Sequence, residues 1–190
     1  PEIMLLGISG ATSCGKSTVV KILSRLLDNV AVIHQDDFYK ADDEIPVRDG
    51  VADWDCKEAI KVDELYDVLA EARATGNVKE HTSFEGKLDK FSELVNDNEL
   101  QLLAAIVNAQ TNNNTKIIIV DGFMLYLDDR FLNLFDKKYL VHAPYHVLKA
   151  RRENRKGYYT EQGFWEDPKG YFDKIVWPAY VEENGKYFKD

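Results

Sequence analysis

The sequence predicts an α/β fold in which helices flank a parallel β-sheet. Short apolar runs typical of buried strands alternate with segments of helical periodicity, and this order requires crossover connections between parallel strands. A glycine-rich loop follows the first apolar run and opens a helix. The 190 residues, of which 45 % are hydrophobic and 30 % charged, suffice for a core of their own. We therefore expect a single domain over residues 1–190.

The predicted elements follow one another in a regular order. Strands are predicted at residues 3–8, 30–33, 117–120 and 139–143. Helices are predicted at residues 17–28, 57–73, 91–110 and 145–155, and near the start of 171–188. The stretches 36–55 and 156–169 are expected to be loop and irregular structure. Because ligands bind beyond the carboxyl ends of parallel strands, functional residues should follow the strands.

Composition and charge exclude several classes of protein. The net charge of −9, from 24 Lys and Arg against 33 Asp and Glu, disfavours a nucleic-acid partner. The longest apolar runs have about five residues, whereas a membrane-spanning helix needs about 20. No secretory leader is visible, and Cys14 and Cys56 are expected to be reduced thiols. We expect a cytoplasmic protein that acts on small molecules without a membrane partner, with a monomer favoured.

Residues 10–17 match the phosphate-binding pattern G-x-x-x-x-G-K-[ST]. Glycines let backbone N–H groups turn toward phosphate oxygens, and the following helix adds its positive end. Lys16 supplies a charge to the outer phosphates, and the Ser17 hydroxyl is a candidate Mg²⁺ ligand. A chance glycine turn is the alternative, but the strand before and the helix after favour a phosphate loop. The predicted nucleotide-binding residues are Gly10, Ala11, Thr12, Ser13, Cys14, Gly15, Lys16, Ser17 and Thr18.

Acidic residues follow two of the predicted strands. Asp121 closes the run 117–120 in the manner of a Walker B acid, which holds Mg²⁺ directly or through water. A turn-forming Asp-Gly pair is the alternative. Asp36 and Asp37 follow the run 30–33, where one of them could take the proton from an acceptor hydroxyl. The alternative for this pair is a solvated loop or a helix cap.

Basic residues gather in one short segment of this acidic chain. They are Lys149, Arg151, Arg152, Arg155 and Lys156. Arginines near phosphates stabilise the charge that develops during phosphoryl transfer, and a mobile lid would exclude water. For any single residue, a solvated face that pairs with nearby acids is an equally good interpretation. We predict an arginine-bearing lid over residues 145–170.

Several short motifs complete the pattern. They are residues 7–10, 35–40, 54–55, 120–124, 151–155, 170–173 and 176–178. The first two resemble the uridine kinase-like P-loop nucleoside kinases. The remaining motifs are similar to those of nicotinamide riboside kinases, and the version at 121–124 resembles the fungal members. The resemblance covers about residues 3–180.

The resemblance implies a P-loop kinase fold and an ATP- and Mg²⁺-dependent reaction. The 5′-hydroxyl of nicotinamide riboside would be phosphorylated to the mononucleotide for NAD biosynthesis, and nicotinic acid riboside is a further candidate acceptor. By motif, Asp36 matches the general base and a Mg²⁺-site acid, beside Ser17 and Asp121. Lys16, Asp36 and Arg152 are then the predicted catalytic residues.

The resemblance also implies residues that bind the two substrates. Tyr39 and Trp54 match aromatic residues beside the nicotinamide ring, and Asp55 and Arg152 match residues that hold the ribose hydroxyls. The cationic ring would favour such aromatic faces near acids. Arg151 and Arg155 match arginines that face ATP. A tyrosine that lines the substrate site would be Tyr158 or Tyr159.

The chain departs from the family pattern in two places. Residues 78–116 form a longer, insert-like helical segment, to which the sequence assigns no chemistry. The family also continues beyond a point near residue 190 into a strand and helix at the adenine pocket, so base recognition is either incomplete here or supplied elsewhere. Weak preference for ATP over GTP would fit either case. Two other functions stay open: a uridine, cytidine or other nucleoside kinase, and a nucleotide-binding regulator without transfer activity.

Overall fold

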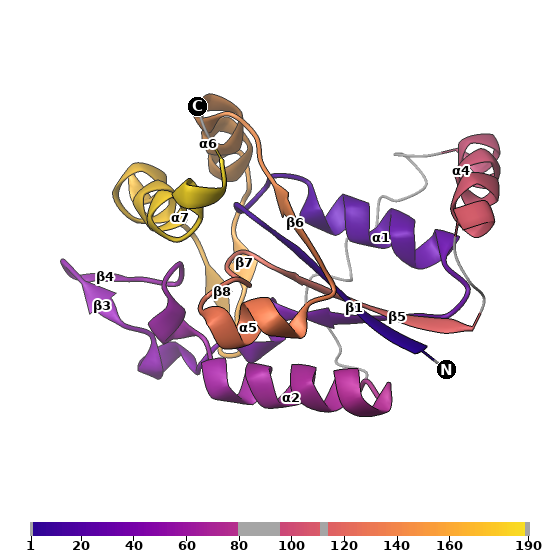
Figure 1. The fold of residues 1–190 in the computed structure, drawn as a ribbon. Coiled ribbons are helices and arrows are strands. Elements are labelled where there is room, and N and C mark those ends of the chain that lie inside the picture. The colour runs from indigo at the N-terminus through magenta and orange to yellow at the C-terminus, as the bar shows by residue number, and fades with distance from the viewer. Residues whose placement is uncertain (1, 80–95, 111–113, 189–190) are drawn as a thin grey trace.

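A computed structural model describes residues 2–79, 96–110 and 114–188, and its centre is a parallel sheet (Figure 1). The strands are β1 (Glu2–Gly10), β2 (Val30–His34), β5 (Thr115–Gly122) and β6 (Lys137–Val141). They lie in the order β2-β5-β1-β6, and every pair is parallel. The predicted fold class is confirmed, with each of the four predicted strands present.

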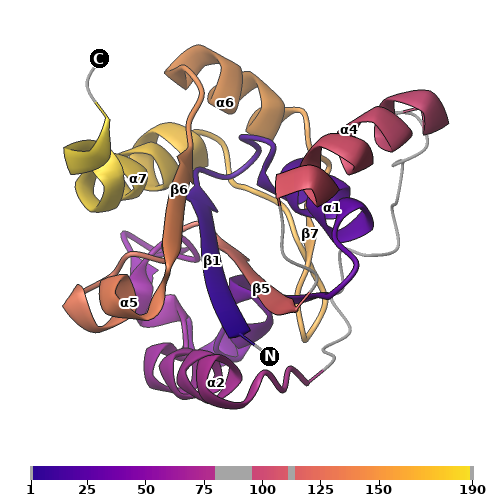
Figure 2. The ribbon, with the colours of Figure 1, turned by 45° about the vertical axis from the view of Figure 1, so that its right-hand side comes forward.

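Helices cover both faces of the sheet. They are α1 (Lys16–Leu26), α2 (Val62–Thr75), α4 (Asp97–Gln110), α5 (Asp129–Leu134), α6 (Tyr145–Glu153) and α7 (Trp177–Asn184). Figure 1 shows α1 on one side of the sheet and α2 on the other. In the view of Figure 2, α4 lies beside α1. Side chains alternate between the two faces of a strand, so β5 can pack against the helices on both faces of the sheet.

The core is built on that alternation. Ile118 and Val120 of β5 pack with Leu65 and Leu69 of α2. Ile117 and Ile119 of the same strand pack in a second cluster with Val20 of α1. The central strands therefore have apolar residues in consecutive positions, as a sheet covered on both faces requires.

A third cluster joins the phosphate loop to the C-terminal helices. Ala11 and Cys14 of the loop are buried against Leu148 of α6 and against Tyr171 and Phe172. Phe172 begins a π-helical turn, Phe172–Val176, that runs directly into α7. This packing places the basic residues of α6 next to the phosphate loop.

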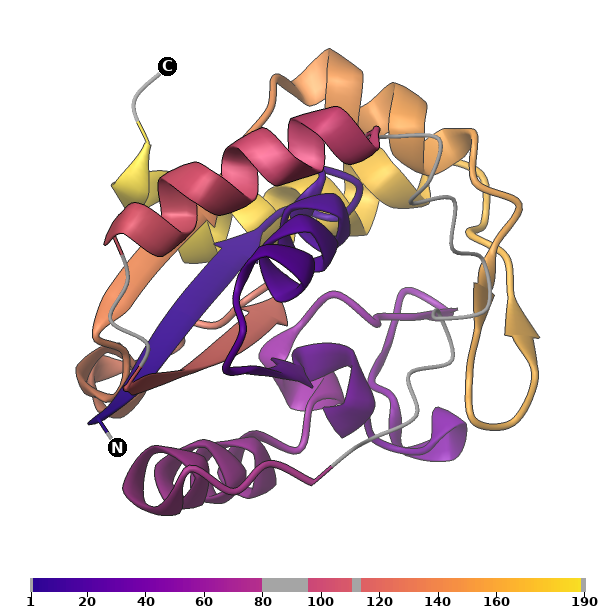
Figure 3. The same ribbon diagram turned by 90° about the vertical axis from the view of Figure 1, so that its right-hand side faces the viewer.

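The loops contain more structure than the sequence predicts. The predicted loop 36–55 overlaps two 3₁₀ turns, Gln35–Phe38 and Asp42–Glu44, and contains the short hairpin of β3 (Val47–Arg48) and β4 (Val51–Ala52). The predicted irregular stretch 156–169 contains a hairpin of β7 (Tyr158–Tyr159) and β8 (Phe164–Trp165). Figure 3 shows this hairpin extending from the end of α6. Helix α5 lies in a stretch for which the sequence analysis proposes no element.

Some predicted boundaries are wrong. The helix predicted from residue 57 begins at Val62, because Lys57–Ala59 form a 3₁₀ turn and Ile60 pairs with Tyr39 in an isolated β-bridge. The helix predicted over 91–110 is present from residue 97, while residues 91–95 lie outside the described part of the chain. The predicted helix near the start of 171–188 ends at Asn184, and a 3₁₀ turn, Gly185–Tyr187, follows it.

None of the helices in the described ranges combines the length and the apolar character that crossing a bilayer requires.

Candidate active site

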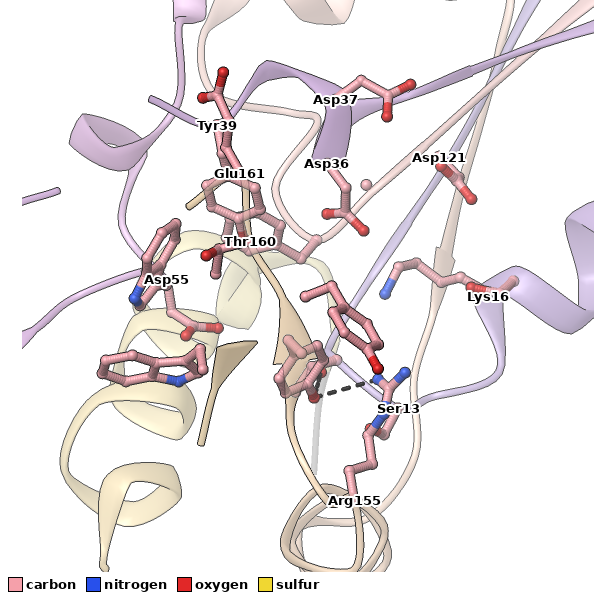
Figure 4. A pocket seen from close by; sticks show the side chains of 18 of the residues that line it. Ser13, Lys16, Asp36, Asp37, Tyr39, Asp55, Asp121, Arg155, Thr160 and Glu161 are labelled. Atoms are coloured by element: carbon pink, nitrogen blue, oxygen red, sulfur yellow. Dashed lines mark hydrogen bonds between the residues drawn. The ribbon is translucent and has the colours of Figure 1, made fainter. Parts of the chain in front are cut away.

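A cavity of about 410 Å³ lies at the carboxyl ends of the strands, where the sheet topology predicts the site. Its walls come from five parts of the chain: the phosphate loop, the segment after β2, the segment after β4, the segment after β5, and the region from α6 through the β7–β8 hairpin. Figure 4 shows Lys16, Asp36 and Asp121 at one end of the cavity and Asp55 at the other.

The phosphate loop has the geometry that its glycines predict. Gly15 caps the start of α1 with a φ of 102°. Gly10 has a φ of 156°, and a Cβ at this position would lie 2.3 Å from the carbonyl oxygen of Val141. Any larger residue at position 10 would therefore push the loop away from β6. The Lys16 ammonium donates a hydrogen bond of 2.8 Å to the carbonyl of Ala11.

The loop side chains divide into two groups. Thr12, Ser13, Lys16 and Ser17 line the cavity. Ala11 and Cys14 are instead buried in the core beneath the loop, so only their backbone groups could meet a ligand. Gly10, Gly15 and Thr18 are likewise outside the side-chain lining of the cavity. The hydroxyl of Ser13 is buried and has no hydrogen-bond partner among the described residues, which fits a loop built to receive an anion.

Three carboxylates lie at or just beyond the ends of two strands at this end of the cavity. Asp36 and Asp37 lie in the turn after β2, and Asp121 lies near the end of β5. The neighbouring Gln35 is fully buried and exchanges two hydrogen bonds with the backbone of Met124, at 2.9 and 3.0 Å. This exchange fixes the segment after β2 against the segment after β5.

Asp121 has a partner that the sequence analysis leaves unassigned. Nδ1 of His34 lies 2.7 Å from Oδ1 of Asp121. This hydrogen bond raises the pKa of His34 above its ordinary value, against the opposing effect of burial. The second carboxylate oxygen of Asp121 is not part of this contact. No motif marks His34, which is why sequence reasoning misses it.

The residues predicted to hold Mg²⁺ offer the oxygen donors that this ion prefers. Ser17, Asp36 and Asp121 all line the cavity and contribute one hydroxyl and two carboxylates. No cluster of three or more His, Cys, Asp or Glu side chains suited to a metal is found in the described part of the chain. A sparse set of this kind fits Mg²⁺ beside phosphates, because Mg²⁺ usually keeps several waters.

The opposite end of the cavity contains a buried ion pair. Asp55 is 7 % exposed, and its Oδ2 lies 3.8 Å from Nη2 of Arg152, which is 6 % exposed. The hydroxyl of Tyr171 donates a hydrogen bond of 3.2 Å to the same carboxylate oxygen. Burial raises the pKa of Asp55, while the charge of Arg152 acts in the opposite direction.

Arg152 connects the two ends of the site. Its guanidinium makes a two-pronged contact with Asp167, at 2.6 and 2.9 Å, and also donates to the Thr12 hydroxyl at 3.0 Å. The indole of Trp165 donates to the same Asp167 at 2.9 Å. Arg152 is therefore held between the phosphate loop and Asp55, with Asp167 fixing its orientation.

The other predicted basic residues differ from Arg152 in their surroundings. Arg151 is exposed and donates to the Ser13 carbonyl at 3.3 Å, and Arg155 lines the cavity and donates to the Tyr158 hydroxyl at 3.2 Å. Lys149 instead forms an ion pair of 2.5 Å with Asp173, outside the cavity. The interpretation of a solvated basic face therefore holds for Lys149. A moving lid over 145–170 stays a prediction.

Aromatic rings line the end of the cavity that contains Asp55. Trp54 lies 5.5 Å from Tyr39, centroid to centroid, with the ring planes at 72°. Phe123 stacks on Tyr39 at 5.8 Å, and Trp165 lies 6.0 Å from Trp54. One flat ring cannot stack on Tyr39 and Trp54 at once, since their planes are steeply inclined.

The two candidate tyrosines of the hairpin have different environments. Tyr158 packs under the guanidinium groups of Arg152 and Arg155, each 4.5 Å from its ring centroid, and its hydroxyl lies 3.4 Å from that of Thr12. Tyr159 also lines the cavity but is 68 % exposed and packs on Phe164. The contacts of Tyr158 lie toward the phosphate loop.

Sequence reasoning misses several residues of this site. Asp167 and Thr160 carry no motif, and Tyr171 and Phe123 belong to motifs without an assigned role. Asp42 lines the cavity and accepts a 2.8 Å hydrogen bond from Thr160, which is 118 positions away in the sequence. Only the acidic composition of residues 42–44 could have pointed to it.

A parallel sheet with a phosphate loop after its first strand, and a cavity that extends from this loop to a buried ion pair among aromatic rings, are the features of a P-loop kinase. Solved structures share this fold. A possible uridine kinase from Bacillus stearothermophilus matches with a TM-score of 0.55 and 17 % identity, over 98 % of this chain and 86 % of that one. A putative fructose transport system kinase from Silicibacter sp. TM1040 matches with a TM-score of 0.52 and 16 % identity, over 82 % and 72 %.

Relatives found by sequence show to which family of P-loop kinases the chain belongs. Nicotinamide riboside kinases from Schizosaccharomyces pombe, Eremothecium gossypii and Saccharomyces cerevisiae are 34 %, 36 % and 35 % identical, and each match covers 98 % of this chain. The matches cover 81 %, 78 % and 80 % of those proteins. No protein-family model matches. The chain belongs to the nicotinamide riboside kinase family.

Proposed function

We propose that the chain transfers the terminal phosphate of ATP to the 5′-hydroxyl of nicotinamide riboside, which yields the mononucleotide for NAD biosynthesis. The observation that carries this proposal is one cavity with a phosphate loop and Asp36 at one end and aromatic walls with the Asp55–Arg152 pair at the other. The fungal relatives, named nicotinamide riboside kinases, supply the identity of the acceptor.

The acceptor end suits a cationic nucleoside. Asp55 and Arg152 present an acceptor and a donor for the ribose hydroxyls, and both are held in place by neighbours. Tyr39 and Trp54 supply aromatic faces, which favour a pyridinium ring over a neutral ring by about 0.5–2 kcal/mol. The acceptor hydroxyl would then lie toward Asp36, which takes its proton.

The nucleotide end suits phosphates. Lys16 and the backbone N–H groups of the loop would contact the phosphate oxygens. Arg155 lines the same cavity, and Arg151 lies beside the loop, where it donates to the Ser13 carbonyl. Ser17, Asp36 and Asp121 would hold Mg²⁺, which neutralises phosphate charge when it is bound. Arg152 stabilises the charge that develops on transfer, because it contacts both Thr12 and the acceptor end.

The test is the release of ADP from Mg-ATP with a panel of acceptors. The panel contains nicotinamide riboside, nicotinic acid riboside, uridine, cytidine and a control without acceptor. We expect turnover restricted to the pyridine ribosides. Turnover on uridine or cytidine alone would show that the acceptor is a different nucleoside. The fold and the proposed phosphoryl-transfer chemistry would then still stand. ATP binding without turnover on any acceptor would contradict the proposal and favour a nucleotide-binding regulator.

A further inference from the structure

Two carboxylates face the buried guanidinium of Arg152. Asp167, which lies shortly after β8, accepts from Nε at 2.6 Å and from Nη2 at 2.9 Å. Asp55, which lies after β4, is 3.8 Å from Nη2, a distance that is too long for a hydrogen bond. Asp167 therefore holds the arginine, while Asp55 lies close to it without taking its N–H donors.

Asp167 is itself fixed in place. The indole N–H of Trp165 donates to its Oδ1 at 2.9 Å. Asp55 and Arg152 line the cavity and Asp167 does not, so Asp167 can influence a bound molecule only through the arginine. On the other side of the guanidinium, Nη1 donates to the Thr12 hydroxyl at 3.0 Å. The guanidinium is thus held in one orientation between the β7–β8 hairpin and the phosphate loop.

The carboxylate of Asp55 keeps acceptor positions for a ligand. Its Oδ2 accepts a hydrogen bond of 3.2 Å from the Tyr171 hydroxyl, whereas a carboxylate has about four acceptor positions. A shift of Nη2 by about 1 Å would bring Arg152 within hydrogen-bond distance of Asp55. Opposite charges attract strongly in a buried setting, so this shift is favoured unless another group holds the arginine back.

We propose that Asp167 is a positioning residue that keeps Arg152 from closing on Asp55. It takes Nε and Nη2, the two donors with which the arginine would otherwise form a two-pronged pair with Asp55. The Asp55 carboxylate then stays open to the ribose hydroxyls of the acceptor. This inference rests on the proposed function and deepens it, because it names the residue that keeps the ribose contact available.

The charges around Arg152 decide where its guanidinium goes once Asp167 is neutral. Asp53, in the same turn as Asp55, forms an ion pair of 3.0 Å with Arg48 and does not compete for Arg152. With Asp167 neutral, Asp55 is the carboxylate that attracts the guanidinium. The arginine and Asp55 would then satisfy each other, and a ribose hydroxyl would have to separate them in order to bind.

The experiment measures the dissociation constant of nicotinamide riboside by isothermal titration calorimetry, with Mg-ADP at saturation. Asp167→Asn keeps the size of the side chain and removes the charge that holds Arg152. We expect it to raise the Kd of the riboside about tenfold, the factor of one hydrogen bond to a charged group. The Kd of ADP, measured separately, should stay close to the wild-type value, because Asp167 does not line the cavity.

A double variant distinguishes this positioning role from a general loosening of the site. Asp55→Asn should also raise the Kd of the riboside about tenfold, since it weakens the ribose contact. With Asp55 neutral, no charge draws Arg152 away, so adding Asp167→Asn should raise the Kd little further. Independent effects would instead multiply to about a hundredfold.

Two further variants serve as controls. Glu166→Gln removes an exposed neighbouring carboxylate that does not line the cavity, and it should bind the riboside as the wild type does. Asp167→Glu keeps the charge and should bind the riboside more tightly than Asp167→Asn. Calorimetry gives the stoichiometry separately from the Kd, so a misfolded fraction does not mimic weaker binding.

Three outcomes would overturn the inference. An unchanged Kd of the riboside in Asp167→Asn would remove Asp167 from acceptor binding and leave the proposed function intact. Multiplied effects in the double variant would show that Asp167 acts independently of Asp55. A wild type that binds no riboside would contradict the proposed function, and the inference with it.

Discussion

Two carboxylates at opposite ends of the cavity (Figure 4), Asp36 and Asp55, differ in how they are held. Asp36 is exposed, whereas Asp55 is 7 % exposed and accepts a hydrogen bond from Tyr171. An exposed carboxylate that points into a cavity can receive a proton from a bound hydroxyl. A buried carboxylate between fixed partners is better suited to position a substrate. This difference in burial supports Asp36 as the base and Asp55 as a ribose contact.

The proposed role of Asp36 as the base leads to the first prediction. Asp36→Asn removes the proton acceptor and keeps the shape, so kcat should fall by about 10²–10⁴-fold. ATP binding, measured by equilibrium titration, should be retained. Asp37→Asn is the matched control, because it removes a neighbouring carboxylate that also lines the cavity. Near-normal turnover of Asp36→Asn would exclude Asp36 as the base.

Arg152 has a structural role beside its proposed chemical role. Its loss would leave the carboxylates of Asp55 and Asp167 without their countercharge in a buried setting. We expect Arg152→Ala to lower the free energy of unfolding by about 3 kcal/mol, measured by urea denaturation. Arg151→Ala removes an exposed neighbour and should change that free energy by about 0.5 kcal/mol or less. Equal stability of the two variants would show that the buried network contributes little.

At the scale of elements, the site depends on how α6 and α7 pack. Leu148 of α6 and Phe172, just before α7, contact the underside of the phosphate loop through Ala11 and Cys14. The loop is thus supported by helices that also carry Arg151 and Arg152. A change in the packing of α6 would move the arginines and the loop together.

A second element contact, around Asp136, leads to a prediction about pH. Asp136 precedes β6 and accepts from the backbone N–H of Leu5 in β1 at 2.8 Å and from Arg73 of α2, at 2.8 Å through Nη2. The hydrogen bond from Arg73 lowers the pKa of Asp136, although burial opposes it. The resulting stability is present above the unfolded pKa of about 3.9 and is lost as the pH falls through the lower folded pKa.

Asp136→Asn should therefore flatten the acid limb of the stability curve. At neutral pH the variant should be about 1–2 kcal/mol less stable than the wild type, and the difference should shrink as the pH falls toward 3. Urea denaturation at a series of pH values measures both quantities. Lys137→Gln, at an exposed position of β6, serves as the control. A difference that is constant with pH would contradict the proposed linkage.

The sequence predicts elements better than it predicts their ends. The apolar run 117–120 predicts a strand because β5 is buried on both faces and therefore has apolar residues at consecutive positions. The start of α2 at Val62 depends on the bridge between Ile60 and Tyr39, which local periodicity does not contain. The β7–β8 hairpin has strands of two residues each, too short for any periodic signal.

The same division applies to the candidate site. Lys16, Asp36 and Asp121 are predictable because each follows a strand at a position that the chemistry requires. Asp167 and Asp42 act through partners that are distant in the chain or in another element, such as Thr160. No local pattern can reveal such pairs. The roles of the predicted residues, and a single domain over residues 1–190, stay predictions.

At the scale of the whole molecule, the carboxyl ends of the strands in one sheet bring the walls of the cavity together. The strand order β2-β5-β1-β6 places the segments after β2 and β5 beside the phosphate loop that follows β1. In the view of Figure 3, the β7–β8 hairpin extends from α6, and its hydrogen bond to Asp42 closes the far wall. The net charge of −9 suits a protein that binds a cationic nucleoside.

The most direct test of this account identifies the product. Mass spectrometry would follow nicotinamide riboside incubated with Mg-ATP whose terminal phosphate is labelled, together with the ADP released. We predict the label in the 5′-mononucleotide, in a one-to-one ratio with ADP. Label that appears only in inorganic phosphate, with the riboside unchanged, would contradict the central claim, because the cavity would then bind ATP without delivering its phosphate to the acceptor.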